Sequence, residues 1–90
     1  MNADRNQHLR AIDAASRDSR VVAAVKEKIK TGCEFCGLGT SAQDAAGRAF
    51  TVTVTFQFIS GKGTNAKRPT VTANVFFEFP EDAYLDVSLV

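Results

Sequence analysis

An uncharged run of alternating residues in the second half of the chain restricts the possible folds more than any other feature. From Ala49 to Ile59 every second residue is apolar: Phe50, Val52, Val54, Phe56 and Phe58. The positions between them carry Thr51, Thr53, Thr55 and Gln57. Successive side chains of a strand point to opposite faces, so this period of two predicts a half-buried β-strand.

Two later runs, Thr70–Phe79 and Tyr84–Val90, have the same alternation and predict two further strands. Between them, Pro80 fixes its own φ and is followed by two acids, a composition that suits an exposed turn. The simplest arrangement is an antiparallel meander in which the strand at 70–79 is central and the strand at 49–59 is an edge.

The first third of the chain has helical spacing instead, over residues 3–15 and 19–31. The apolar positions of the two segments would not share a face of one straight helix, so a break near Asp18 is predicted. Asp18 or Ser19 can cap the second helix, and Gly32 fits its C-terminal end. The buried positions expected in the two helices are Leu9, Ile12, Ala15, Val21, Val22, Val25 and Ile29.

Residues 32–40 are expected to form a loop, and the spacing of Thr40 and Gln43 is typical of a capping box. A short third helix over 41–46 is therefore predicted before the first strand. The complete prediction is an α+β fold in one domain, residues 1–90, with a helical part at 1–47 and a β meander at 48–90. Two helices, plus the short third, pack on one face of a three-stranded antiparallel sheet.

Length and composition narrow the class of protein. Ninety residues suit one core, and 44% hydrophobic with 23% charged residues is ordinary for a folded domain. The apolar runs are too short to span a membrane, and the charged N-terminus does not resemble a signal peptide, so a cytoplasmic location is expected. The net charge of +1 combines +5 over residues 1–68 with −4 over residues 69–90. His8 has no catalytic partner at a meaningful spacing, so neither an enzyme nor a cofactor is expected.

The predicted edge strand indicates a function through association. Because it has no charge, Pro or Gly to blunt it, its free backbone is expected to be covered by the N-terminal helix, by a second copy or by another protein. The sequence therefore predicts a small non-enzymatic protein-binding module of inhibitor or adaptor type, homodimeric through residues 49–59. The expected interface residues are Thr51, Thr53, Thr55, Ile59, Phe76 and Tyr84.

Two alternatives remain open. The loop between the first two predicted strands carries Lys62, Lys67 and Arg68, so its basic stretch at 61–68 could bind a nucleic-acid backbone. Cys33 and Cys36 have the C-x-x-C spacing of half a zinc site, and two copies could share one zinc ion.

Overall fold

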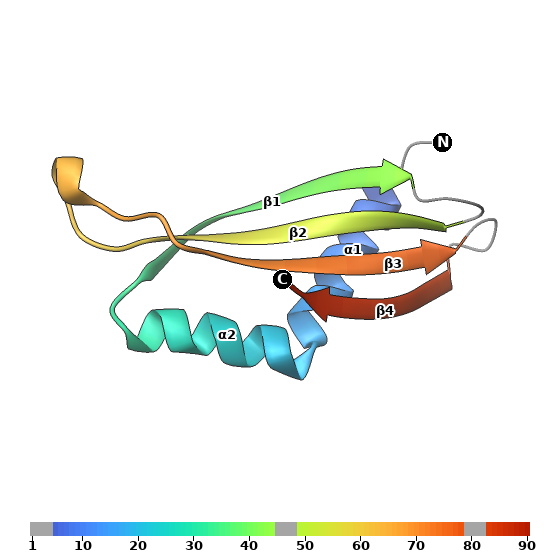
Figure 1. Cartoon of the computed structure of the whole chain (residues 1–90), viewed down its shortest axis with the longest axis horizontal. Coiled ribbons are helices and arrows are strands. Elements are labelled where there is room, and N and C mark those ends of the chain that lie inside the picture. Colours follow the sequence, from blue (N-terminus) through green and yellow to red (C-terminus); the bar gives the residue numbers. More distant parts are fainter. Residues whose placement is uncertain (1–4, 45–48, 79–82) are drawn as a thin grey trace.

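The computed structural model describes residues 5–44, 49–78 and 83–90, and at positions 44 and 83–85 it describes the backbone alone. Two helices are followed by strands joined by short connections, with one turn of 3-10 helix between the second and third strands (Figure 1). The elements are α1 (Arg5–Arg17), α2 (Ser19–Lys30), β1 (Glu34–Asp44), β2 (Ala49–Ile59), η1 (Gly63–Asn65), β3 (Thr70–Glu78) and β4 (Ala83–Leu89).

The strands form one antiparallel sheet in the order β1-β2-β3-β4, so each strand pairs with the next one along the chain. Both helices lie on one face of this sheet, where α1 contacts β1, β2 and β3 and α2 contacts β1 and β3. The opposite face is free of helices throughout the described ranges, and α1 passes behind the strands in Figure 1. The predicted α+β class and antiparallel meander are confirmed, but the described sheet has four strands rather than three.

The additional strand is β1, and here the sequence prediction is wrong. Residues 34–40 are not a loop and residues 41–44 do not begin a helix; positions 45 and 46 of the predicted helix lie outside the described residues. The segment contains Gly37, Gly39, Ser41 and Ala42, which have low strand propensity. Backbone pairing with β2, interrupted only at Cys36, stabilises the strand although its side chains do not favour one, so tertiary context overrides the local preference.

The predicted break between the helices is confirmed at Asp18. Its backbone is extended (φ −69°, ψ 127°), and its side chain accepts hydrogen bonds from the backbone N–H groups of Arg20 at 2.9 Å and Val21 at 3.2 Å. This is the geometry of a helix N-cap, which satisfies donors that the first turn leaves unpaired. At the other end of α2, Gly32 has φ +94°, a conformation that favours glycine.

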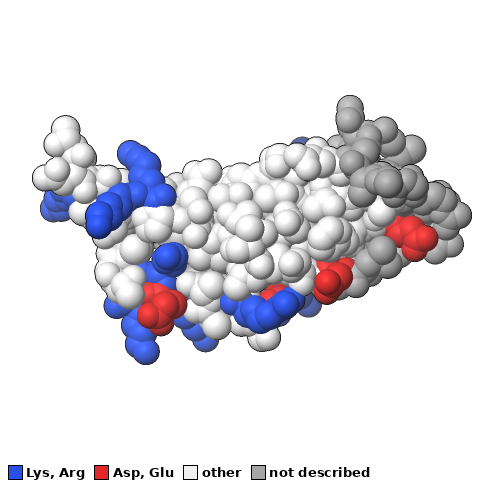
Figure 2. Space-filling view, in the orientation of Figure 1, with Lys and Arg blue, Asp and Glu red and all other residues white. Residues whose placement is uncertain are grey.

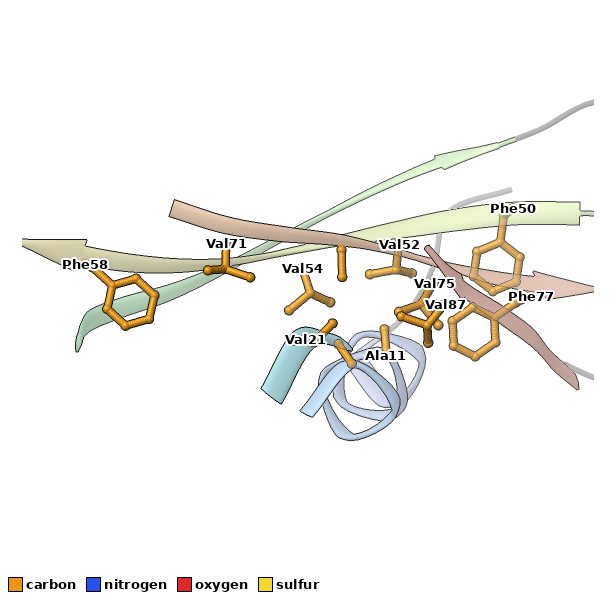
Figure 3. Packing of buried hydrophobic residues seen from close by; sticks show 12 residues of the cluster. Ala11, Val21, Phe50, Val52, Val54, Phe58, Val71, Val75, Phe77 and Val87 are labelled. Carbon is orange, nitrogen blue, oxygen red and sulfur yellow. The ribbon is translucent and has the colours of Figure 1, made fainter. Parts of the chain in front are cut away.

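The core is the alternating face of β2 and β3 packed against the helices, as predicted. Phe50 and Phe77 lie opposite each other in register and stack with ring centroids 5.1 Å apart, while Phe58 lies far from them along the sheet (Figure 3). Buried aliphatic residues fill the space between these two ends, and they are Ala11, Ala15, Val21, Val52, Val54, Val71, Ala73, Val75 and Val87.

Several expected core positions are more exposed than the sequence indicates. Leu9 is 52% exposed, because the face of α1 that packs on the sheet consists of Gln7, Ala11 and Ala15. Small alanines let the helix approach the strands closely, and Leu9 falls about half a turn away from that face. Ile29 is 54% exposed, Leu89 is also exposed and Phe56 is only half-buried.

Candidate functional site

Strand β2 lies inside the sheet, between β1 and β3 (Figure 1). The prediction that residues 49–59 form a sheet edge is therefore wrong, and a homodimer paired along that strand has no free backbone to use. The reason is the unforeseen strand β1, which occupies the side of β2 that was expected to be open. The uncharged strand is indeed covered, but by its own chain rather than by the N-terminal helix, a second copy or another protein.

The threonines expected at the interface lie on the helix-free face of the sheet. Thr51, Thr53 and Thr55 are all half-buried, and the Thr53 hydroxyl donates a hydrogen bond of 2.7 Å to the side-chain oxygen of Asn74. The middle of this face over β2 and β3 carries no charged side chain, and Lys, Arg, Asp and Glu lie toward its ends and along its β4 margin (Figure 2). It is a polar, uncharged surface.

The apolar residues expected on the same face do not come together. Phe76 is half-buried opposite Thr51, near one end of β2, whereas Ile59 is half-buried opposite Glu34, at the other end. The side chain of Tyr84 lies outside the part of the chain that the structure describes. The apolar patch proposed for this face is therefore not formed by Ile59 and Phe76.

The edges of the described sheet are β1 and β4. The pairing of β1 with β2 is interrupted by a register shift between Phe35 and Gly37, which leaves Cys36 as the extra residue of a bulge. Beyond the bulge the pairing is regular from Leu38 to Gln43, and these six residues carry no charge and no proline. Long edges without such features are templates for pairing with another chain.

The β4 edge is shorter and has a partner. Strand β4 carries Asp86 in its middle, and the Arg20 guanidinium donates a hydrogen bond to the backbone carbonyl of Val87. Arg20 is held in turn by Asp18, 3.1 Å away between Nη2 and Oδ2. The first turn of α2 therefore covers part of the β4 edge.

An apolar groove opens between the helices and β2. It encloses ≈ 260 Å³, has Phe56 as its sheet residue and is lined by Ser16, Val21, Val22, Val25 and Lys26 on the helices. Leu38 of β1 lies opposite Phe56 in the sheet register and is 42% exposed. The groove and the regular part of the β1 edge are therefore neighbours on the helix side of the sheet.

Element lengths explain why this groove stays open. The 11 residues of β2 span about 36 Å, whereas the 12 residues of α2 span about 18 Å. Two short helices set at an angle cannot cover strands of that length, so Phe56 and Leu38 remain accessible. This comparison of lengths is available from the sequence and could have indicated an incompletely covered sheet.

The predicted nucleic-acid residues lie in the connection between β2 and β3. Ser60 and Lys67 exchange two backbone hydrogen bonds of 2.9 and 2.7 Å, which close the loop around η1. Lys62, Lys67 and Arg68 are all exposed. The end of α2 lies at the same end of the molecule, and Figure 2 shows Lys and Arg gathered there.

The two cysteines are free thiols in different surroundings. Cys33 is half-buried, with its sulfur 3.9 Å from the Thr31 hydroxyl, whereas Cys36 is exposed at the β1 bulge. His8 lies elsewhere, where its Nδ1 is 2.8 Å from the hydroxyl of Thr40 on β1. Among the described side chains, no three residues of the metal-binding types are grouped closely enough to hold an ion.

Comparison with known protein families, with curated proteins and with solved structures gives no match for this chain. Within the described ranges, neither helix has the length and apolar character needed to cross a membrane. The free edge, the groove and the charged end are the surface features of the described residues that a partner could use.

Proposed function

We propose that this chain is a non-enzymatic protein-binding module, of inhibitor or adaptor type, that associates through the free edge of β1. The observation that carries the proposal is the stretch Leu38–Gln43, a regular strand with a neighbour on one side only and no charge or proline to prevent pairing. Addition of a strand to such an edge gives main-chain hydrogen bonds, and a groove beside it receives alternate side chains. Both components are present here, because the groove at Phe56 adjoins Leu38.

The occupant that fits this edge best is a second copy of the chain. An uncharged strand brings no like charges together when it pairs with itself, and an antiparallel pair of identical strands has two-fold symmetry. A register centred on Thr40 would set Leu38 of each copy opposite Ala42 of the other, with the two Thr40 residues side by side. Such cross-strand pairs of large with small residues and of threonine with threonine are compatible with a stable ladder.

The pairing would also extend both layers of the molecule. Because the two-fold axis would be perpendicular to the sheet, the helices of both copies would lie on the same face. The two four-stranded sheets would then become one sheet of eight strands. Leu38 is 42% exposed in the single chain, and the added strand would remove part of it from water.

The test is the mass of the particle in solution, measured by light scattering and sedimentation over a range of protein concentrations. Reductant is required, because Cys36 is exposed beside the proposed interface and could form disulfide-linked dimers. The wild-type chain is expected to form dimers, and Ser41→Lys is expected to be monomeric. Ser41 is exposed, so its lysine variant adds a charge to the edge without disturbing the core.

Ser88→Lys on β4 is the matched control. It makes the same substitution on the same face of the sheet but at the other edge, and it should leave the dimer intact. A strictly monomeric wild-type chain at high concentration would exclude a second copy as the occupant. A dimer that Ser88→Lys disrupts and Ser41→Lys does not would place the interface at β4 and contradict the proposal.

A further inference from the structure

The fold collects positive charge at one end of the molecule from two parts of the sequence. The last turns of α2 supply Lys26, Lys28 and Lys30, and the loop around η1 supplies Lys62, Lys67 and Arg68. Together with Glu27 and Glu34 they amount to six cations against two carboxylates, a net charge of +4. We call the six cations the basic end.

Short connections bring these two segments together. The N–H of Cys33 donates a 3.0 Å hydrogen bond to the carbonyl of Lys28, so β1 leaves directly from the last turn of α2. The first residue of β1, Glu34, then pairs with Ile59, the last residue before the loop. Figures 1 and 2 show the result: the end of α2, the loop and a group of blue side chains lie at the same end of the molecule, with red side chains among them.

An exposed aromatic ring lies between the two segments. Phe35 is 53% exposed and lies opposite Phe58 at the base of the loop. Its ring centroid is 5.7 Å from that of Phe58, edge to face, and 6.5 Å from that of Phe56. The two inner rings support Phe35 from within the sheet, so part of a supported aromatic ring is left open to a ligand.

A small cavity lies at the base of the same loop. It encloses ≈ 280 Å³ and is lined by Cys36, Gln57, Phe58, Arg68 and Thr70. Gln57 and Thr70 are register partners on the helix-free face of the sheet, whereas Phe35 belongs to the helix side. Gly37 leaves room for the Gln57 amide, since a Cβ on this glycine would lie 3.0 Å from Oε1. A ligand that uses both the cavity and the ring must therefore bend around the edge of the sheet.

From this arrangement we infer that the basic end binds single-stranded nucleic acid, with the six cations on phosphates and Phe35 stacked on one base. Cationic grooves combined with aromatic stacking are the usual means of binding single strands. A single strand is flexible enough to pass around the loop from the ring to the cavity, whereas a duplex is not. This site uses none of Leu38–Gln43 and shares only Lys26 with the lining of the groove at Phe56, so it can be tested apart from the proposed dimer edge.

The experiment is fluorescence anisotropy with labelled single-stranded DNA and RNA of about twelve nucleotides, repeated with a duplex of the same length and with polyglutamate as competitor. If the six cations each contact a phosphate, affinity for a single strand should fall about 300-fold between 50 and 200 mM salt. Binding should be tighter to the single strand than to the duplex, and polyglutamate should compete poorly. The DNA and RNA arms identify which nucleic acid is preferred.

Two variants and their controls test the assigned residues. Lys62→Ala/Lys67→Ala should lower the slope of log affinity on log salt by about 1.4, and the matched control Arg5→Ala/Arg17→Ala, on exposed positions of α1, should leave it unchanged. Phe35→Leu should weaken binding at least fivefold, because it removes stacking worth roughly 1–3 kcal/mol per base, and Phe35→Tyr should restore it. Both Phe35 variants keep an apolar side chain against Phe56 and Phe58, so the fold is retained.

Measurements in the Ser41→Lys background keep the result separate from dimer formation. Absence of binding at 50 mM salt, equal binding of duplex and single strand, or equal binding by wild type and Phe35→Leu would each overturn the inference. Efficient competition by polyglutamate would show that the basic end accepts an acidic protein instead.

Discussion

The two edges of the sheet are held in place by different means. Strand β4 has Val87 fully buried in the core and a hydrogen bond from Arg20 to its backbone. Strand β1 is longer, but none of its described side chains, at positions 34–43, is buried. It is held mainly by backbone pairing with β2, with added contacts of Phe35 with Phe56 and Phe58 and of Thr40 with His8. One edge is anchored by side chains and the other by its ladder of hydrogen bonds.

This difference bears directly on function. The β4 edge is partly covered by its own molecule, so it leaves few backbone hydrogen-bonding groups for a partner. The β1 edge leaves one side of its backbone free, so a strand from a partner could add hydrogen bonds there. The anchoring of β4 and the openness of β1 therefore favour β1 as the surface for association.

The largest difference is expected from truncating the core residue of β4. Val87→Ala removes two buried methyl groups and should lower the free energy of unfolding by about 2 kcal/mol, through lost burial and the cavity left behind. Leu38→Ala removes more carbon from β1, yet it should cost less than half as much because Leu38 is 42% exposed. Urea denaturation of both variants in the Ser41→Lys background measures the contrast, and equal losses would contradict it.

The same contrast should be visible without mutating the core. In the monomeric Ser41→Lys variant, amides of β1 that bond to β2 should exchange with solvent about tenfold faster than amides of β4 that bond to β3, because local opening exposes less buried surface at β1. Hydrogen exchange followed by NMR gives both rates. In the wild-type chain, dimer formation should slow exchange along Leu38–Gln43 and leave β4 unchanged.

The sequence predicts the buried strands and the helix break of this molecule much better than the exposed edge strand β1. The alternation of β2 and β3, the break at Asp18 and the end of α2 before Gly32 follow from local side-chain pattern and backbone preference, and all are confirmed. Strand β1 has no such pattern, because a strand without a buried side chain needs no apolar period. Its existence depends on β2, a partner that begins several residues later in the chain.

The candidate site could be predicted only in part for the same reason. The exposed cations of the loop follow from composition, and the structure places them as expected. The position of the free edge depends on counting the strands, so one unrecognised strand moved the edge from residues 49–59 to residues 34–44. The groove at Phe56 depends on the lengths and angle of the helices, and the angle is a tertiary quantity that local spacing does not contain.

A smaller effect is expected from the contact that ties α1 to the open edge. Thr40→Val keeps the shape of the side chain but removes the hydroxyl that lies 2.8 Å from His8 Nδ1. The loss of one hydrogen bond should lower the free energy of unfolding by about 1 kcal/mol. Thr55→Val, the same substitution on the helix-free face of β2, is the control and should change stability by less. If the two variants are equally stable, the contact with His8 does not help to hold β1.

The smallest effect should come from the charge of Asp18, a half-buried residue that holds Arg20 against the β4 edge. The hydrogen bond from the Arg20 side chain lowers the pKa of Asp18 below its ordinary value of 3.8, and backbone N–H groups of α2 act in the same direction. A carboxyl whose pKa is lowered by folding stabilises the native state above its unfolded pKa, and this contribution disappears as the pH falls through the folded value.

Asn is also a good N-cap, so Asp18→Asn removes the charge and keeps the cap. The variant should be slightly less stable than the wild type at pH 7 and equally stable once the pH is well below 3.8. Thermal unfolding at both pH values measures this, and a difference that persists in acid would mean that the shape of the side chain, rather than its charge, supports the β4 edge.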